Sequence, residues 1–157
     1  SPQLQALAGR RKILTGTNAL DPMHGCCRPV CQNSWIKEKT EEVKAFLRAW
    51  IRAEAFLLDN QEECVKINEK YLKLDEEQTR IMLLETNQGY ESEPKSNGVR
   101  YMWELLGKLN YAETEGIDVE KHINAALYKE ALDELQQKEP DNKRYKEFAE
   151  RYVKYNQ

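Results

Sequence analysis

The chain has 157 residues with a formal net charge of −3, and 32% of its residues are charged. This length fits one domain, or one lobe of a larger protein, and the lack of a basic surplus argues against nucleic acid as a partner. No apolar run approaches the roughly 18 residues of a membrane span. The sequence lacks an initial Met and shows no signal peptide at Ser1. We therefore expect a processed protein or a piece of a longer one.

Two short strands are predicted near the N-terminus. Residues 1–9 have the pattern of a helix end, and residues 13–15 form the first strand candidate. Gly25 to Gln32 form the second, in which Pro29 favours a sheet edge because proline has no N–H to donate. Two strands do not make a stable sheet. The pattern therefore predicts that the missing strands belong to a larger α/β protein or to another copy.

The remainder of the chain is predicted to be helical. A short helix should end at Lys39, and the next, Thr40 to Asp59, has the richest apolar stripe of the sequence. Its apolar residues recur at the three-and-four spacing of a buried helix face. They are Val43, Phe46, Leu47, Trp50, Ile51, Leu57 and Leu58.

Shorter helices follow, separated by polar connections. They are predicted at residues 61–72, 76–87, 96–109, 119–123 and 125–136, and from Pro140 onward, with a loop at 88–97. Asn60, Asp75 and Asp118 are the expected N-caps. The apolar stripe of the last helix either packs back on the lobe or contacts a partner or a second copy. It consists of Tyr145, Phe148, Tyr152 and Val153.

Five segments, in this order and spacing, resemble a known family. They are Glu41–Leu47 (EEVKAFL), Asn60–Cys64 (NQEEC), Leu74–Glu77 (LDEE), Trp103–Leu109 (WELLGKL) and Tyr128–Leu132 (YKEAL). The order resembles the C-terminal half of the periplasmic solute-binding proteins of nitrate, sulfonate, taurine and thiamine-precursor ABC importers. The resemblance covers roughly residues 1 to 135. Thr40 departs from the usual proline, and the tail from Pro140 extends past the usual family end.

The resemblance implies a fold and a function. The fold would be α/β, mainly helical in this chain, as part of a two-lobed hinged protein with short strands completing a sheet. Residues 1–137 would be the C-terminal portion of a solute-binding lobe, and residues 138–157 a helical extension. The chain would capture a small anion, or a pyrimidine-like thiamine precursor, in an interlobe cleft and pass it to an ABC permease. That implies a periplasmic or extracellular location, secreted or lipid-anchored, and neither cofactor nor catalysis.

The segment from His24 to Cys31 is the one whose side chains suggest ligand binding or other chemistry. In the family this strand starts near the cleft, so the resemblance implies ligand contacts from His24, Cys26, Cys27 and Arg28. The Arg28 guanidinium suits a sulfonate, carboxylate or nitrate, although a salt bridge to a nearby acid is its commoner use. A metal site of Cys26, Cys27, Cys31 and His24 is the weaker alternative, because neighbours in a strand point to opposite faces.

Other readings stay open. The chain could be a helical interaction module without a ligand, dimerising through a strand edge or its C-terminal helix. It could also be a metal-dependent relative of the thiamine-pyrimidine synthases, which carry a cysteine-rich segment in a similar place. A disulfide between Cys27 and Cys31, or from this cluster to Cys64, would need an oxidising compartment. His122 is expected to be solvated or capping, and the three tryptophans are expected to be core residues.

Overall fold

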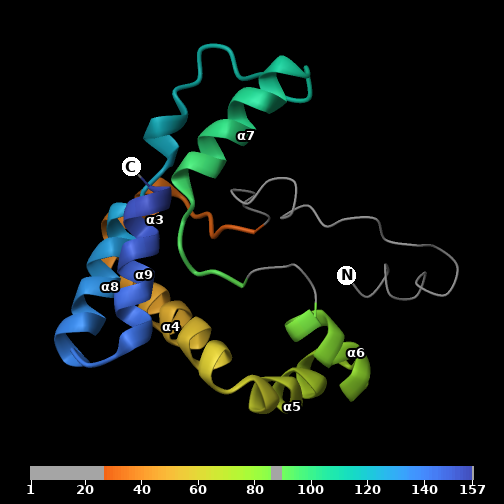
Figure 1. The fold of residues 1–157 in the computed structure, drawn as a ribbon. Coiled ribbons are helices and arrows are strands. Elements are labelled where there is room, and N and C mark those ends of the chain that lie inside the picture. Colours follow the sequence, from red (N-terminus) through yellow and green to blue (C-terminus); the bar gives the residue numbers. More distant parts are fainter. Residues whose placement is uncertain (1–26, 86–89, 157) are drawn as a thin grey trace, which may run out of the picture. The chain divides into compact units, whose positions relative to one another are not determined.

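The computed structural model describes residues 27–85 and 90–156, and their regular structure is entirely helical (Figure 1). The predicted α/β fold with a sheet is therefore wrong for this part of the chain. Residues 27–32, the described part of the second strand candidate, are neither strand nor helix, and residues 13–15 lie outside the described residues. Pro29 lacks a ladder donor, and no described segment offers a strand edge for residues 27–32 to pair with.

The first helices lie where the sequence predicts them, although α6 ends earlier than expected. They are α3 (Asn33–Glu38), α4 (Thr40–Asp59), α5 (Gln61–Leu72) and α6 (Glu76–Arg80). A single helix was predicted over residues 76–87, but α6 passes into a π-helix, η1 (Ile81–Glu85). Asp75 caps α6 as predicted, by accepting a hydrogen bond from the Gln78 N–H at 2.8 Å. Asn60 makes no side-chain cap; its amide instead donates to the carbonyl of Phe56.

The later helices are α7 (Ser96–Lys108), the 3₁₀-helix η2 (Val119–His122), α8 (Ala126–Lys138) and α9 (Lys143–Tyr155). Asp118 caps η2 by accepting from the Glu120 N–H. The last helix begins after Pro140, because Asn142 supplies the cap through the Arg144 N–H.

The chain divides into two compact units. One contains the described residues from Ala53 to Glu91, and the other contains those up to Arg52 and from Ser92 onward. The boundary falls within α4, so this helix contributes to both units. In the first unit, the Arg80 guanidinium joins α6 to α5 through two bonds of 2.6 Å to the carboxylate of Glu62.

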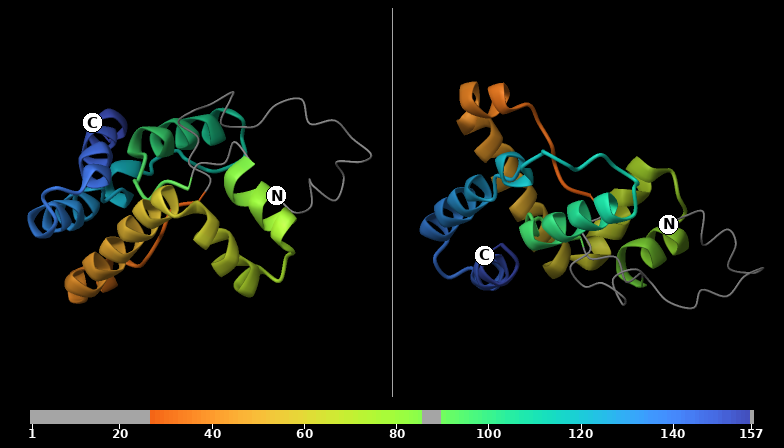
Figure 2. Two further views of the ribbon diagram at one scale, coloured as in Figure 1. Left: turned by 60° about the horizontal axis from the view of Figure 1, so that its bottom comes forward. Right: turned by 90° about the horizontal axis from the view of Figure 1, so that it is seen from above.

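The core of the second unit is built mainly by α8 and α9, which lie side by side (Figure 2). Its fully buried apolar and aromatic side chains come from three helices and are Ile51, Tyr128, Ala131, Leu132, Leu135, Tyr145 and Phe148. The C-terminal stripe thus packs back on its own unit through Tyr145 and Phe148. The prediction for α4 is only partly right. Val43 and Ile51 are buried, but Phe46 is 53% exposed.

The connection before α7 is buried although its sequence is polar. Ser92, Glu93, Lys95 and Ser96 are each at most 5% exposed. The Glu93 carboxylate accepts from the Lys95 N–H and from the Asn156 amide, and the Arg151 guanidinium lies 3.8 Å away. Two hydrogen bonds and a nearby cation thus offset part of the free-energy cost of burying the Glu93 carboxylate.

Candidate ligand-binding groove

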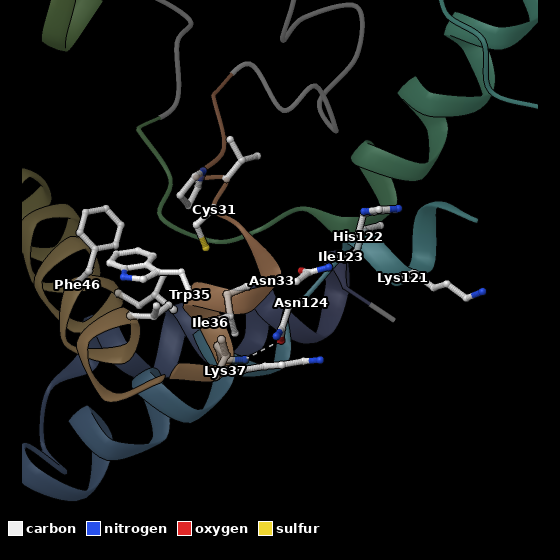
Figure 3. Close-up of a pocket in the computed structure, with 15 residues that line it drawn as sticks. Cys31, Asn33, Trp35, Ile36, Lys37, Phe46, Lys121, His122, Ile123 and Asn124 are labelled. Atoms are coloured by element: carbon white, nitrogen blue, oxygen red, sulfur yellow. Dashed lines mark hydrogen bonds between the residues drawn. The ribbon is translucent and has the colours of Figure 1, made fainter. Parts of the chain in front are cut away.

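A groove of about 730 Å³ lies on the second unit (Figure 3). Its walls come from residues 29–31, from α3 and the start of α4, and from residues 121–124 with Leu127. Small-molecule sites in proteins span roughly 300–1,000 Å³, so the groove is large enough for a ligand. We refer to it as the α3–α8 groove. A second hollow, of about 380 Å³, shares Trp35 but is lined otherwise by Gln32, Ser34 and Glu38, so it lacks an apolar floor.

One end of the α3–α8 groove is aromatic. Trp35 and Phe46 stand there with 48% and 53% of their surfaces exposed. The Phe46 ring meets the Trp50 ring edge-on, with 5.3 Å between the centroids, which fixes its orientation. The floor continues through the aliphatic side chains of Ile36, Val43, Leu47, Ile123 and Leu127. Exposed aromatic surface of this kind is typical of binding sites rather than of a closed core.

The other end of the groove is basic and polar. Lys37, Lys121 and His122 line it together with the amides of Asn33 and Asn124. Figure 3 shows both lysine side chains extended on the side away from the aromatic rings. No acidic residue is among the described residues that line the groove. The nearest acidic partner of Lys121 is the Asp118 carboxylate, 3.8 Å away and outside the lining. The groove is therefore polarised between an apolar end and a cationic end.

Ion pairs between α4 and α8 hold two walls of the groove together. The Glu134 carboxylate accepts from Lys44 Nζ at 3.0 Å and from Arg48 Nη1 at 2.5 Å. The hydrogen bond from Lys44, and then the charges of Arg48 and Lys44, lower the pKa of Glu134 against some desolvation. Bonds to Glu41 and Glu134 raise the pKa of Lys44 above its ordinary value. Both partners are thus charged at neutral pH.

Neither of the described residues predicted as ligand contacts, Cys27 and Arg28, lines this groove, whereas Cys31, which was named only for the metal alternative, does. His24 and Cys26 lie outside the described residues. Cys27 is exposed, and Cys31 is exposed and lines the groove, with its sulfur directed toward α3 (Figure 3). The Arg28 guanidinium bonds to two main-chain carbonyl oxygens, those of Pro94 at 3.0 Å and of Cys27 at 2.5 Å. Its observed role is to tie residues 27–31 to the connection before α7.

The metal alternative stays a prediction, because two of its four residues, His24 and Cys26, lie outside the described residues. No group of three or more His, Cys, Asp or Glu side chains in the described part of the chain is placed to hold an ion. The described cysteines form no disulfide with one another. Cys64 is buried in α5, and desolvation raises the pKa of its thiol, which makes it a poor nucleophile.

Sequence reasoning missed most of the groove. His122 is exposed, in agreement with the expectation of a solvated side chain, but its place in the groove was not predicted. Lys37 and Lys121 drew no functional prediction. The local signal is the run Lys121-His122-Ile123-Asn124 between a cap and a helix. In the groove this run lies with residues about 80 positions earlier in the sequence, and that arrangement depends on the tertiary fold.

Comparison with protein-family models, with curated proteins and with solved structures gives no significant match. Within residues 27–85 and 90–156, no helix has both the length and the apolar composition that a bilayer crossing requires.

Proposed function

We propose that this chain is a non-catalytic binding protein whose α3–α8 groove takes a small amphiphilic anion. The observation that carries this proposal is the polarity of the groove, which has aromatic rings at one end and cationic side chains at the other. A ligand with an apolar body and one carboxylate or sulfonate matches both ends at once.

The two ends would contribute in different ways. Burying the ligand body against Trp35 and Phe46 removes apolar surface from water, at roughly 25 cal/mol per Å². Lys37 and His122 donate hydrogen bonds to an anionic head group, and Lys121 adds positive charge beside it. Because the lysines are exposed, their contribution is modest and sets selectivity for charge more than affinity.

This proposal keeps part of the expectation drawn from the family resemblance. A small anionic solute remains the proposed ligand, but its site is a groove between helices, and it includes Cys31 without Arg28 as a ligand contact. Delivery to an ABC permease and a periplasmic or extracellular location stay predictions of the resemblance.

Octyl compounds of matched chain length test the proposal. Titration calorimetry with octanesulfonate and octanoate should show binding, and octylammonium, which has the same alkyl chain but a positive charge, should bind more weakly. Lys37→Glu combined with Lys121→Glu should weaken octanesulfonate binding by roughly 10-fold. Phe46→Ser should weaken all octyl compounds alike.

Lys70→Glu is the matched control, because Lys70 is exposed on α5 and does not line the groove. It should leave octanesulfonate binding unchanged. Equal affinity for octylammonium and octanesulfonate, or equal losses in the Lys70→Glu and groove variants, would show that the basic end of the groove does not select an anion.

A further inference from the structure

A second surface of the same unit exposes apolar side chains at the end of α7. Leu109, Tyr111 and Ile117, in the connection after α7, are 55%, 79% and 46% exposed. We call these three residues the α7 tip. Large apolar side chains gathered on the surface commonly mark a protein interaction site.

The α7 tip is held by a defined turn. The Tyr111 N–H donates to the Leu106 carbonyl at 2.9 Å, and the Ile117 N–H donates to the Thr114 carbonyl at 3.3 Å. Asn110 has a φ of 55°, the left-handed conformation that commonly ends a helix. Thr114 packs so closely on α7 that a Cβ added to Gly107 would lie 2.1 Å from its Oγ1. The apolar side chains are therefore displayed by an ordered backbone.

The charges around the tip are acidic. Glu113 and Glu115 are exposed next to Tyr111, and neither has a lysine or arginine within ion-pair distance in the described chain. Glu104, also on α7, is already paired with Lys108. The tip is thus apolar with excess negative charge, whereas the groove is apolar with positive charge and no acidic lining.

We propose that the α7 tip of one copy docks into the α3–α8 groove of a second copy. Tyr111 and Leu109 would enter the aromatic end of the groove, and Glu113 and Glu115 would face Lys37 and Lys121. Aromatic and large aliphatic side chains of this kind are the usual anchors of protein interfaces. The inference rests on the same groove as the proposed function and names a second occupant for it.

This contact joins two different surfaces, so it is heterologous. Such contacts propagate into rings or open chains unless the rotation between copies closes. Three tip side chains bury less than the roughly 1,200–2,000 Å² of a stable interface, so the association is weak and reversible. It also weakens with salt, because exposed charges are screened beyond about 10 Å at 0.1 M ionic strength.

Sedimentation velocity over a concentration series, up to the millimolar range, tests the contact with the full chain. The wild type should associate, and should do so less at high salt. Leu109→Ser/Tyr111→Ser (tip variant) and Lys37→Glu/Lys121→Glu (groove variant) should each lower the association constant at least about 10-fold. Tyr71→Ser is the control, since Tyr71 is 81% exposed on α5 in the other unit, and it should associate as the wild type does.

Mixing the two variants gives the sharpest result. The tip variant keeps an intact groove and the groove variant keeps an intact tip, so an equimolar mixture should form a dimer and stop there. A mixture that stays monomeric, a wild type that is monomeric at all concentrations, or variants that associate like the wild type would each overturn the proposal. Far-UV circular dichroism should be the same for all variants, because the substituted side chains are exposed.

Anion binding separates the two proposals. The tip variant should bind octanesulfonate with the wild-type affinity. Association with successful mixing but without octanesulfonate binding would support the second copy as occupant and refute the small-ligand function. Octanesulfonate binding without any self-association would support the small-ligand function and refute the second copy as occupant.

Discussion

The Asn156 side chain connects the end of α9 to the buried connection before α7. Its Oδ1 accepts from the N–H and the hydroxyl of Ser96 at 2.9 and 2.7 Å, and its amide donates to Glu93 at 2.8 Å. It thereby takes the place of an N-cap for α7, because Lys95, at the cap position, makes no side-chain cap. One residue thus serves a helix end and a buried carboxylate at once.

Removing this amide should destabilise the second unit. We expect Asn156→Ala to lower the free energy of unfolding by about 1–3 kcal/mol, because buried donors and acceptors lose their partner. Urea denaturation followed by circular dichroism measures the change. Asn60→Ala, which removes an exposed amide bonded to the Phe56 carbonyl, should stay within about 0.5 kcal/mol of the wild type. Equal effects of the two substitutions would contradict the role of Asn156.

The lowered pKa of Glu134 predicts an acid-sensitive contribution to stability. A carboxyl whose pKa is lower in the folded state than its ordinary value of 4.5 binds protons more readily when unfolded. Its stabilisation is therefore present above pH 4.5 and is lost as the pH falls through the lowered value. We expect Glu134→Gln to reduce the fall in unfolding free energy below pH 4.5.

Urea denaturation at a series of pH values measures that slope. Glu115→Gln is the control, because the exposed Glu115 has no cationic partner in the described chain, and it should leave the slope as in the wild type. An unchanged slope in Glu134→Gln would mean that the ion pairs between α4 and α8 do not stabilise the folded state.

Among the elements, the close packing of α7 on the turn that follows it requires a glycine at position 107. Helix propensity alone favours alanine over glycine by about 1 kcal/mol. At position 107, however, the added Cβ would meet the Thr114 side chain at 2.1 Å. We expect Gly107→Ala to lower the unfolding free energy by about 1–3 kcal/mol through overpacking. Thr114→Ala in the same chain should restore part of it, as measured by thermal and urea denaturation; no recovery would place the strain elsewhere.

The helices were the part of the fold that local sequence determines. The bounds of α4 and α5 agree with the prediction because apolar spacing and helix-breaking residues are local signals. The strand predicted over residues 25–32 was wrong for its described part, because Val30 and Cys31 suit a strand only where a neighbouring strand pairs with them. The sequence spacing of α4 likewise could not separate the buried Ile51 from the exposed Phe46.

The sequence indicated few of the residues that line the candidate groove, for a related reason. Of the residues singled out between His24 and Cys31, only Cys31 lines the groove among those described. The strand and cleft of the resembled family directed attention to Arg28, whose guanidinium is engaged by main-chain carbonyls. The placement of α3 and residues 121–124 around one groove depends on the tertiary fold, and no local pattern encodes it.

At the scale of the whole molecule, the two proposed occupants of the groove exclude each other. Linkage then requires an amphiphilic anion to weaken self-association, and self-association to weaken anion binding by the same factor. We expect octanesulfonate to shift the wild type toward monomer in sedimentation velocity. Methanesulfonate, which carries the same charge without the alkyl chain, should have only the effect of added salt. An association unaffected by saturating octanesulfonate would show that the two do not share a site.

The buried polar connection also decides where this chain can be divided. Secondary structure and polarity would both suggest that an α7–α9 fragment starts at Ser96, the first residue of α7. Such a fragment would lack Glu93, the carboxylate that receives the Asn156 amide and lies beside Arg151. It would leave the cation of Arg151 inside the fold without that charge. The natural first residue of this piece is Ser92, where the compact unit itself resumes, so a polar stretch of the chain belongs to its interior.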